Sequence, residues 1–451
     1  MPAILTTLFT MYLNQLSTFV SSPRNFYLTI IGAGPAGLAC GIKSLQLCPN
    51  QPVLLLEKSQ RVGGPCNTAK IGNFEFEVGC NQPPIGFEQT LKTLGVEHSF
   101  ASRSNECVFE NGTTLRSPFD FKTVWHFLSY PVSSAKFFWR SLYGETGKQL
   151  SSILLGLNPA FSNEVQASFS YPTLGPDINL GLLRVMMAQS MQYPRIPIGG
   201  MTSVTDKMRD RFLRLGGQVA FLNECQEIKK LPNGRKLIKT KNGNAYQSDL
   251  VISSVDAWKY YPPQSRPGLA LTTLLFAIKS SCKYLRRTHT TAFLPKNFTY
   301  RMSEIRLGGS LPDSFGFHCF INSLPEQNGC YTVTAYMPTP RGIEELTEEQ
   351  AKKIREYVIT KIASRIHNFR AAIVESHVIS PAEYVRRFGM ANNIPLLESP
   401  AGFTAPKYNK EIDTYFIGSS VNSPNVLAAI DSGIKAAEDI HSSFSNVTYR
   451  V

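Results

Sequence analysis

The stretch Leu28–Ala39 reads LTIIGAGPAGLA and carries three glycines at the spacing G-x-G-x-x-G. In such a loop Gly32 allows the tight turn and Gly34 lets the backbone approach a diphosphate. Gly37 lets the following helix pack closely on the strand. The N-terminus of that helix then faces the anion with unpaired backbone N–H groups. The stretch alone is a weak signal, so its surroundings decide whether it is a nucleotide site.

Those surroundings have the order that a dinucleotide site needs. The apolar run Phe26–Ile31 predicts a strand before the glycines, and Leu38–Leu47 predicts a helix after them. A second apolar strand follows at Pro52–Leu56 and ends in Glu57, 20 residues after Gly37. A carboxylate at this distance is expected to bind a ribose hydroxyl. The sequence therefore predicts a dinucleotide-binding unit.

Further segments identify a family resemblance. Leu54–Gly64, LLLEKSQRVGG, resembles the continuation of the glycine loop in flavoproteins with two dinucleotide-binding domains. Gly72–Cys80, GNFEFEVGC, resembles the hairpin that comes next in that family. Four later segments match the family in order: Tyr193–Met208, Leu215–Ile228 as one strand, Ser248–Trp258 and Thr414–Ile440. The combination is specific for FAD, although no single segment is.

The resemblance is strongest to the branch with phytoene desaturases, carotenoid isomerases, protoporphyrinogen oxidases and flavin amine oxidases. It implies that the carboxylate holds the adenosine ribose, the later glycine pair lies beside the cofactor, and a C-terminal helix points its N-terminus at the flavin or the diphosphate. The cofactor-binding residues it implies are Gly32, Gly34, Pro35, Ala36, Gly37, Glu57, Lys58, Gly63, Gly64, Cys225, Gly418, Ser419, Asn425, Val426 and Leu427.

Some departures from the family pattern refine this expectation. Ser419 stands where the family often has Asp, and Cys225 stands where it usually has Val. No cysteine follows Cys330, so the C-terminal cysteinyl link of some amine oxidases is missing and FAD is expected to be non-covalent. A second glycine loop for a nicotinamide is absent. The expected electron acceptor is therefore oxygen or a quinone-like molecule.

The resemblance implies an α/β fold with a discontinuous Rossmann-like FAD-binding domain and an inserted α+β substrate domain. The segments assigned to the FAD domain are 26–98, 193–260 and 400–451, and those assigned to the substrate domain are 99–192 and 261–399. The inserted segments are rich in aromatic residues. These residues predict either an apolar substrate tunnel or ordinary core packing, and the second interpretation is the commoner one.

Composition bounds the partners and the compartment. Lys and Arg number 46 against 33 Asp and Glu, giving a net charge of +13, which favours an anionic partner. No nucleic-acid-binding motif is present, so nucleic acid ranks last. One basic cluster flanks a predicted hairpin at Pro232–Gly234 and a second lies on a predicted helix, 347–370; solvated surfaces are the simplest explanation of both. Nine cysteines without a C-x-x-C pair favour reduced thiols and a cytoplasmic location.

Two segments raise the alternative of peripheral membrane contact. Residues 1–25 form an apolar leader with no charge before Arg24, but the leader is too polar for a confident membrane span. It predicts an interfacial helix, a helix packed on the protein, or a frayed end. The helix 347–370 opens with a capping box at Thr347–Gln350 and places Ile354, Val358, Ile362 and Ile366 on one face. It can lie on an anionic membrane or cover a sheet, and we favour the second.

Three functions remain open. The first is an FAD-dependent oxidoreductase that dehydrogenates or isomerises a small apolar substrate, such as a polyene or tetrapyrrole. The second is a flavin amine oxidase. The resemblance implies that amine oxidases carry a lysine below the flavin in the strand that corresponds to Leu269–Lys279. The only lysine of this segment lies at its far end, which disfavours the amine oxidase. The third is a flavin-binding protein without turnover. No catalytic residue is assigned: the histidines lack a base–nucleophile pattern, no metal-ligand spacing occurs, and Cys66 and Cys80 are interpreted as packed thiols.

Overall fold

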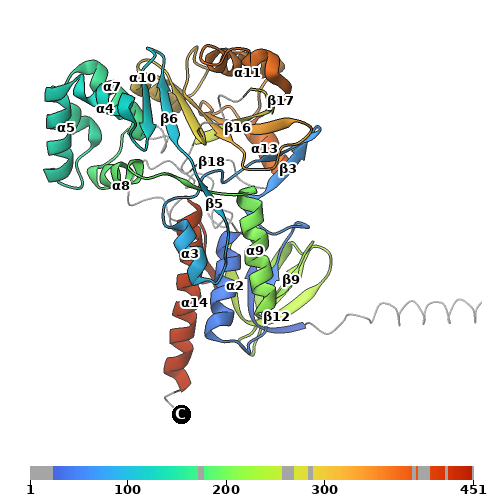
Figure 1. Ribbon diagram of the computed structural model, residues 1–451. Coiled ribbons are helices and arrows are strands. Elements are labelled where there is room, and N and C mark those ends of the chain that lie inside the picture. The colour runs from blue at the N-terminus through green and yellow to red at the C-terminus, as the bar shows by residue number, and fades with distance from the viewer. Residues whose placement is uncertain are drawn as a thin grey trace, which may run out of the picture.

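A computed structural model describes residues 24–170, 177–255, 269–282, 288–388, 393–394, 407–421 and 425–448. The leader prediction therefore lies outside the described residues, apart from its last two positions, which begin a strand. The molecule has a lower part built on one sheet and an upper part built on another, with a lobe of helices projecting from the upper part (Figure 1). The expected α/β class with a Rossmann-like domain and an α+β domain is confirmed.

The lower sheet has the strand order β10-β11-β12-β1-β2-β9, with β20 beside β12 and β19 beside β20. Its central pairs, β12 with β1 and β1 with β2, are parallel. Both faces of these strands are covered, which explains their continuous apolar runs. The strands are β1 (Arg24–Ile31), β2 (Val53–Leu56), β9 (Gln218–Ala220), β10 (Cys225–Lys230), β11 (Lys236–Thr240), β12 (Ala245–Ser253), β19 (Tyr408–Asn409) and β20 (Thr414–Phe416).

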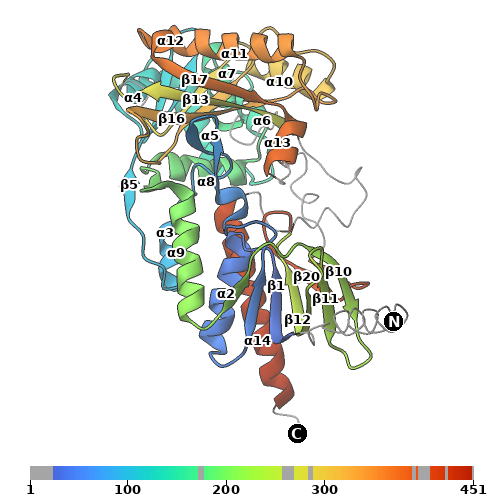
Figure 2. The same ribbon diagram turned by 90° about the vertical axis from the view of Figure 1, so that its right-hand side faces the viewer.

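Three helices lie together on one side of this sheet (Figure 2). They are α2 (Pro35–Leu47), α9 (Gly200–Arg214) and α14 (Val426–Thr448), and the short α3 (Phe87–Thr93) lies beside them. The helix predicted from Leu38 begins three residues earlier, because proline is well tolerated at the first helical position. The single strand predicted over Leu215–Ile228 is wrong. The structure has β9 and β10 there, separated by Leu222 with a positive φ of 58°.

The upper sheet has the order β17-β13-β16-β15-β14-β6-β7. Its strands are β6 (Asn105–Phe109), β7 (Thr114–Ser117), β13 (Leu269–Lys279), β14 (Thr290–Leu294), β15 (Phe317–Ile321), β16 (Cys330–Pro338) and β17 (Ile373–Ile379), with β18 (Asn393–Ile394) paired to β13. The helices packed on this sheet are α10 (Phe298–Leu307), α11 (Glu348–Ala363), α12 (Phe369–Ala372) and α13 (Pro381–Phe388).

The structure of α11 tests the prediction of a basic amphipathic helix over residues 347–370. The capping box of Thr347 and Gln350 is present, and Ile354, Val358 and Ile362 are buried in the upper core. The helix therefore covers a sheet with its charged side outward, as favoured. The predicted continuation to residue 370 is wrong, since α11 ends at Ala363 and the buried Ile366 lies in the turn before α12.

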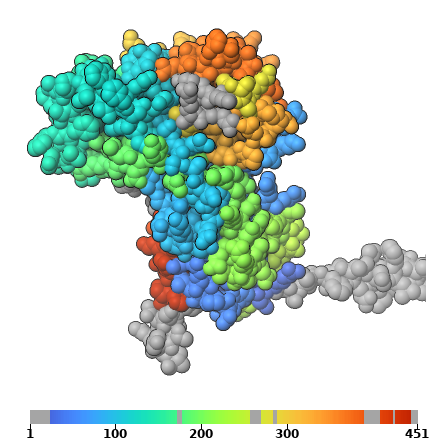
Figure 3. All heavy atoms as spheres, in the orientation of Figure 1, coloured from blue at the N-terminus to red at the C-terminus, as the bar shows by residue number. Residues whose placement is uncertain are grey.

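A lobe of five helices projects from the upper part. It comprises α4 (Phe121–Leu128), α5 (Pro131–Tyr143), α6 (Leu150–Leu154), α7 (Pro159–Ser170) and α8 (Leu180–Ser190). The lobe has its own core, in which Phe127, Phe137 and Phe161 pack edge to face. In the space-filling view it stands away from the lower part (Figure 3). We refer to α4–α8 as the helical lobe.

Two short sheets connect the lower and upper parts. β5 (Phe100–Ser102) pairs with β8 (Arg195–Pro197), and β3 (Thr68–Ile71) forms a hairpin with β4 (Phe74–Glu77). At the end of this hairpin the buried Glu77 carboxylate joins both parts. Its Oε1 accepts a hydrogen bond from Met201 N on α9 at 3.0 Å, and its Oε2 accepts one from Ser323 N after β15 at 2.8 Å. Burial raises the pKa of Glu77 to about 7, although these two bonds act against the rise.

This junction predicts a pH-dependent stability. Glu77 binds more protons in the folded chain than in the unfolded chain between its ordinary pKa of 4.5 and its raised pKa of about 7, so the free energy of unfolding falls as pH rises through that window. The loss is on the order of 3 kcal/mol. A Glu77→Gln variant should melt at a lower temperature, because its amide accepts only one of the two N–H bonds, and its melting temperature should change less between about pH 5 and pH 8.

Thermal melting followed across this pH range checks the effect. Glu75→Gln is the matched control, because Glu75 lies exposed on the same strand. Identical pH profiles for the wild type and Glu77→Gln would contradict the assigned role.

Candidate cofactor site

The glycine loop leaves β1 and enters α2 as the sequence predicts. Gly32 has a φ of +94°, the left-handed conformation that the tight turn requires. A Cβ on Gly37 would lie 2.0 Å from the Gly32 carbonyl oxygen, so only glycine permits this close packing. Gly34 caps α2 and Pro35 occupies its first turn. Among the described residues, outside the two chain neighbours and the helix's own backbone, no heavy atom lies within 4 Å of the position that a Cβ on Gly34 would take.

Glu57 lies at the same loop. Its Oε2 accepts a hydrogen bond from Ala33 N at 2.8 Å, and its Oε1 accepts from the backbone N–H of Ser59 at 2.9 Å. The carboxylate is buried, whereas Lys58 is exposed. The strand-end acid is therefore fixed in place by the backbone of the glycine loop.

The second glycine pair faces the first loop. Gly63 N donates to Ala33 O at 2.8 Å, and both Gly63 and Gly64 have positive φ, 117° and 49°. A Cβ on Gly64 would lie 3.5 Å from the Gly34 Cα. Two backbone segments without side chains thus face each other across the N-terminus of α2.

The C-terminal segment Thr414–Ile440 also contacts the glycine loop that follows β1. Ile417 N donates to Ser253 O at 2.9 Å, which places Gly418 near Ala36; a Cβ on Gly418 would lie 3.9 Å from the Ala36 Cβ. Gly418 N donates to the Ser432 hydroxyl of α14 at 2.8 Å. Ser419 is exposed. Residues near both ends of the chain therefore border one site.

The N-terminus of α14 completes this border. Asn425 accepts a hydrogen bond from Ala428 N at 2.8 Å and so caps the helix. Val426 is buried, and Leu427 lies against Gly86, whose Cβ position is 3.6 Å from the Leu427 Cδ2. The partial positive charge at this helix N-terminus favours an anionic or partly negative group nearby.

Cys225 lies at the edge of the site. Residues 220–223 run beside Glu57, because Glu57 N donates to Ala220 O at 2.9 Å and Asn223 N donates to Glu57 O at 2.8 Å. Cys225 opens β10 two residues later and is partly buried. Of the predicted residues, the structure leaves Lys58, Ser419 and Asn425 exposed.

A connecting segment links this site to the upper sheet. Cys80 N donates to Pro65 O at 2.9 Å, directly after the Gly63–Gly64 pair. From there Tyr336 on β16 donates to Asn81 Oδ1 at 3.0 Å, and Thr290 on β14 donates to Gln82 Oε1 at 2.8 Å. The face of the upper sheet that bears Thr290 and Tyr336 is therefore turned toward the glycine loops.

That sheet face carries no Asp, Glu, Lys or Arg in the two rows that strand pairing defines. On strands β6, β14, β15, β16 and β13 the rows are Asn105, Thr290, Phe320, Thr334 and Leu275, and Cys107, Ala292, His318, Tyr336 and Thr273. On β17 the first row continues to His377, whose Nε2 lies 2.6 Å from Glu375 Oε1. Burial lowers the pKa of His318 to about 3, so its imidazole is neutral near pH 7. Burial also lowers the pKa of His289 to about 4; its Nε2 lies 2.9 Å from Asn81 O. We refer to these two rows as the uncharged face.

Sequence reasoning missed this face. In the sequence the histidines are considered only together, and none of Asn81, Gln82 and Tyr336 is singled out. The alternation in CYTVTAYMP, residues 330–338, was an available signal, because it puts Thr332, Thr334 and Tyr336 on the side opposite Val333 and Ala335.

Cys66 is buried and hydrogen-bonded to Cys80, which together with burial raises the pKa of its thiol. Both cysteines pack as expected.

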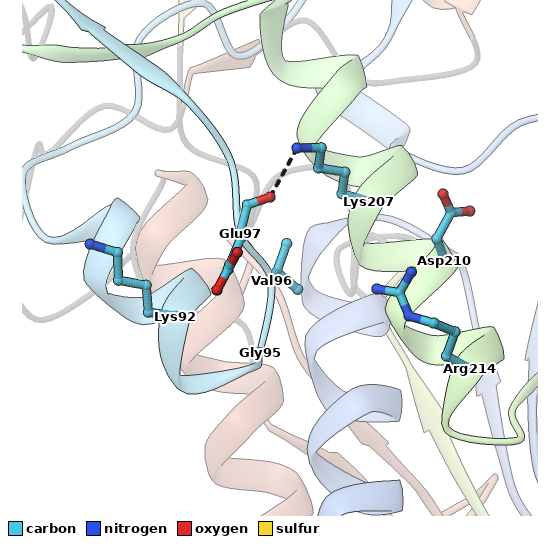
Figure 4. A pocket seen from close by; sticks show the side chains of 7 residues that line it. All are labelled: Lys92, Gly95, Val96, Glu97, Lys207, Asp210 and Arg214. Atoms are coloured by element: carbon cyan, nitrogen blue, oxygen red, sulfur yellow. Dashed lines mark hydrogen bonds between the residues drawn. The ribbon is translucent and has the colours of Figure 1, made fainter.

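Two surface hollows lie outside the glycine loops. One of about 510 Å³ is bordered by Lys92, Gly95, Val96, Glu97, Lys207, Asp210 and Arg214, between α3 and α9 (Figure 4). There Lys207 donates to Glu97 O at 3.0 Å, and charges of both signs are mixed. The other, of about 200 Å³, lies between β5, β8 and the upper sheet; His289, Ile198 and Tyr331 border it. The second lies beside the uncharged face, because His289, which borders the hollow, directly precedes Thr290 in the chain.

Comparison with known proteins identifies the family. A model of NAD(P)-binding Rossmann-like domains matches residues 30–84, and a model of flavin-containing amine oxidoreductases matches residues 84–441. The chain belongs to the flavin-containing amine oxidoreductase family. The protein is therefore an FAD-dependent oxidoreductase, and the open backbone cradle at Gly34 and Gly64 fits a diphosphate. A search of curated proteins gave no match.

Solved structures agree on the fold at low sequence identity. Putrescine oxidase bound to putrescine aligns with a TM-score of 0.61 and 15% identity over 93% of this chain and 99% of its own. Cyclohexylamine oxidase from Brevibacterium oxydans gives 0.57 and 14% over 93% and 99%. A putative protoporphyrinogen oxidase from Exiguobacterium gives 0.55 and 13% over 94% and 99%. At this identity the likeness establishes the fold alone.

The open backbone site at Gly34 and Gly64 predicts that a Gly34→Asp variant is purified without bound FAD and is therefore colourless. An aspartate would put both a side chain and a negative charge where the loop meets the diphosphate, and the expected loss of bound FAD is complete. Visible absorbance after purification measures it. Gly147→Asp is the matched control, since Gly147 also has open space and lies far along the helical lobe. A Gly34→Asp protein with full flavin content would contradict the assigned loop.

The close approach of α14 to α2 predicts an effect on stability and on FAD retention. A Cβ on Gly433 of α14 would lie 2.2 Å from the Ala36 carbonyl oxygen of α2. Gly433→Ala should therefore lower the melting temperature and weaken FAD retention, although alanine favours a helix over glycine by about 1 kcal/mol. Ser442→Ala, on the exposed side of the same helix, serves as the control. If Gly433→Ala were stabilised, the close approach of the two helices would be refuted.

Proposed function

We propose that this oxidoreductase removes hydride from a small apolar substrate, of the polyene or tetrapyrrole type, in a desaturation or isomerisation. The observation that carries the proposal is the uncharged face, which lies next to the glycine loops and consists of neutral side chains. An ionic substrate placed there would lose its hydration without gaining a counter-charge from the two rows, which is costly. An apolar substrate has no such cost.

The roles of the chain's own residues follow from their places. Bound flavin supplies a hydride acceptor at N5, and the protein supplies orientation and electrostatics. The loop at Gly34 and the Gly63–Gly64 pair would hold the diphosphate, and Glu57 would hold the ribose. The capped N-terminus of α14 would favour negative charge on the reduced cofactor. Tyr336 and His318 would orient the substrate as neutral groups, and oxygen or a quinone-like molecule would reoxidise the enzyme.

A second candidate is the oxidation of an amine. The family match and the printed names of putrescine oxidase and cyclohexylamine oxidase favour it. Against it, the only lysine on β13 is the exposed Lys279 at the strand end. The two rows also offer no carboxylate to a charged ammonium group. The apolar substrate therefore remains our proposal.

Anaerobic reduction of the purified flavoprotein separates these functions. We expect porphyrinogen or polyene pools to bleach the visible flavin absorbance, and simple amines, including putrescine and cyclohexylamine, to leave it unchanged. Gly34→Asp protein provides the control without cofactor. Bleaching by amines alone, with peroxide formed in air, would establish amine oxidation instead. Bound FAD that no reductant bleaches would indicate a flavin-binding protein without turnover.

A further inference from the structure

The outer surface of the helical lobe is unusually apolar. Its first two helices expose large side chains to solvent, with the following exposed fractions: Phe121 78%, Trp125 62%, Leu128 62%, Trp139 65%, Leu142 61% and Tyr143 70%. Val124 and Val132 are exposed as well. Soluble proteins seldom expose so many large apolar groups on consecutive elements, and such patches mark interaction sites.

These side chains form continuous stripes. On α4 the exposed positions Phe121, Val124, Trp125 and Leu128 follow helical spacing, and on α5 Val132, Trp139 and Tyr143 do the same. The opposite sides of these helices already supply the lobe core through Phe127 and Phe137. Both helices are therefore apolar on the side that faces water as well, where a soluble helix is normally polar.

Charge on the same helices is of one sign. Residues 121–143 contain Lys122, Lys136 and Arg140 and no Asp or Glu. Arg140 is used inside the lobe, where it donates to the carbonyl oxygens of Ile153 and Leu155. Lys122 and Lys136 are exposed beside the aromatic stripes. Tryptophan and tyrosine beside lysine is the composition of a helix that lies in a membrane interface.

We propose that the α4–α5 face of the helical lobe docks onto a lipid bilayer with anionic headgroups, the aromatic stripes entering the interface and the two lysines contacting the headgroups. The bilayer is favoured over a protein partner by the positive charge of the exposed Lys122 and Lys136 and by the tryptophan–tyrosine content. Among the described residues no helix is long and apolar enough to cross a bilayer. The proposal does not depend on the substrate.

The tryptophans allow a direct test. The chain has three, Trp125, Trp139 and Trp258, of which the last lies outside the described residues. In a Trp258→Phe background, full-length holoprotein should bind vesicles of phosphatidylcholine with phosphatidylserine, and brominated lipid should quench the two remaining tryptophans. The leader contains no tryptophan, so a leader that binds alone gives no such quenching.

Variants identify the surface. Trp125→Ser combined with Trp139→Ser should reduce co-sedimentation with these vesicles about tenfold or more, because each side chain buries apolar area in the interface. Lys122→Glu with Lys136→Glu should reduce it on anionic vesicles and not on phosphatidylcholine alone. Tyr300→Ser with Leu307→Ser, two exposed apolar residues on α10, is the matched control and should leave binding unchanged.

Three outcomes would overturn the proposal. The first is vesicle binding without tryptophan quenching and without an effect of the lobe variants, which would assign the membrane contact to another segment. The second is an oligomer in solution that the tryptophan variants dissociate, with no vesicle binding, which would assign the face to a second copy of the chain. The third is a monomer that binds no vesicle. Flavin content and reduction kinetics, measured in parallel, show whether the proposed function fails separately.

Discussion

The approach of α14 to α2 is the constraint on which the site depends. Gly433 lets the C-terminal helix rest on the Ala36 carbonyl at the first turn of α2, and Gly418 then lies against the same turn. β20 joins the sheet beside β12, so β20 and α2 share one edge of the site. A cofactor bound there is enclosed by segments almost 400 residues apart in sequence, and neither segment alone could form the site.

The sequence allowed prediction of the cofactor site because its information is local. Gly32, Gly37 and Glu57 lie within one strand–helix–strand unit, and their spacing follows from the geometry of that unit. The uncharged face could not be predicted in this way. His318, Tyr336 and Thr290 come from three strands, and which side chains stand beside each other depends on strand register, which tertiary packing sets.

Two element boundaries, the break between β9 and β10 and the end of α11, could not be predicted from residue types. Leu222 adopts a positive φ, a conformation that branched side chains disfavour, so nothing in LGGQVAFLNECQEI signals a break between β9 and β10. The break exists because Leu222 N and Asn223 N bond to Ser59 and Glu57. Likewise the apolar period continues to Ile366 although α11 has ended, because the turn that follows the helix packs into the same core.

Charge is the property that most needed the structure for its interpretation. The basic hairpin of β10 and β11 is largely paired: Lys239 lies 3.1 Å from Glu227, Lys241 lies 2.7 Å from Glu224, and Lys236 lies 3.2 Å from Asp413. Its count of lysines therefore indicates no partner. The helical lobe has fewer cations, but Lys122 and Lys136 lie beside exposed aromatic groups. A net charge of +13 does not by itself identify an interaction surface. The local balance of charge and exposed apolar area does.

The same reasoning applies to the substrate. Family membership fixes the cofactor and the class of reaction, whereas the solved structures of this fold carry names that refer to amines and to protoporphyrinogen. The groups that we propose to hold the cofactor are largely backbone groups, so we expect that site to tolerate wide change in the neighbouring side chains. In the function that we propose, substrate choice depends on the side chains of the upper sheet. Because the two rows carry no charged group, we propose that they favour a neutral apolar molecule. We expect a single carboxylate introduced there to alter substrate choice more than a change at the glycine loops.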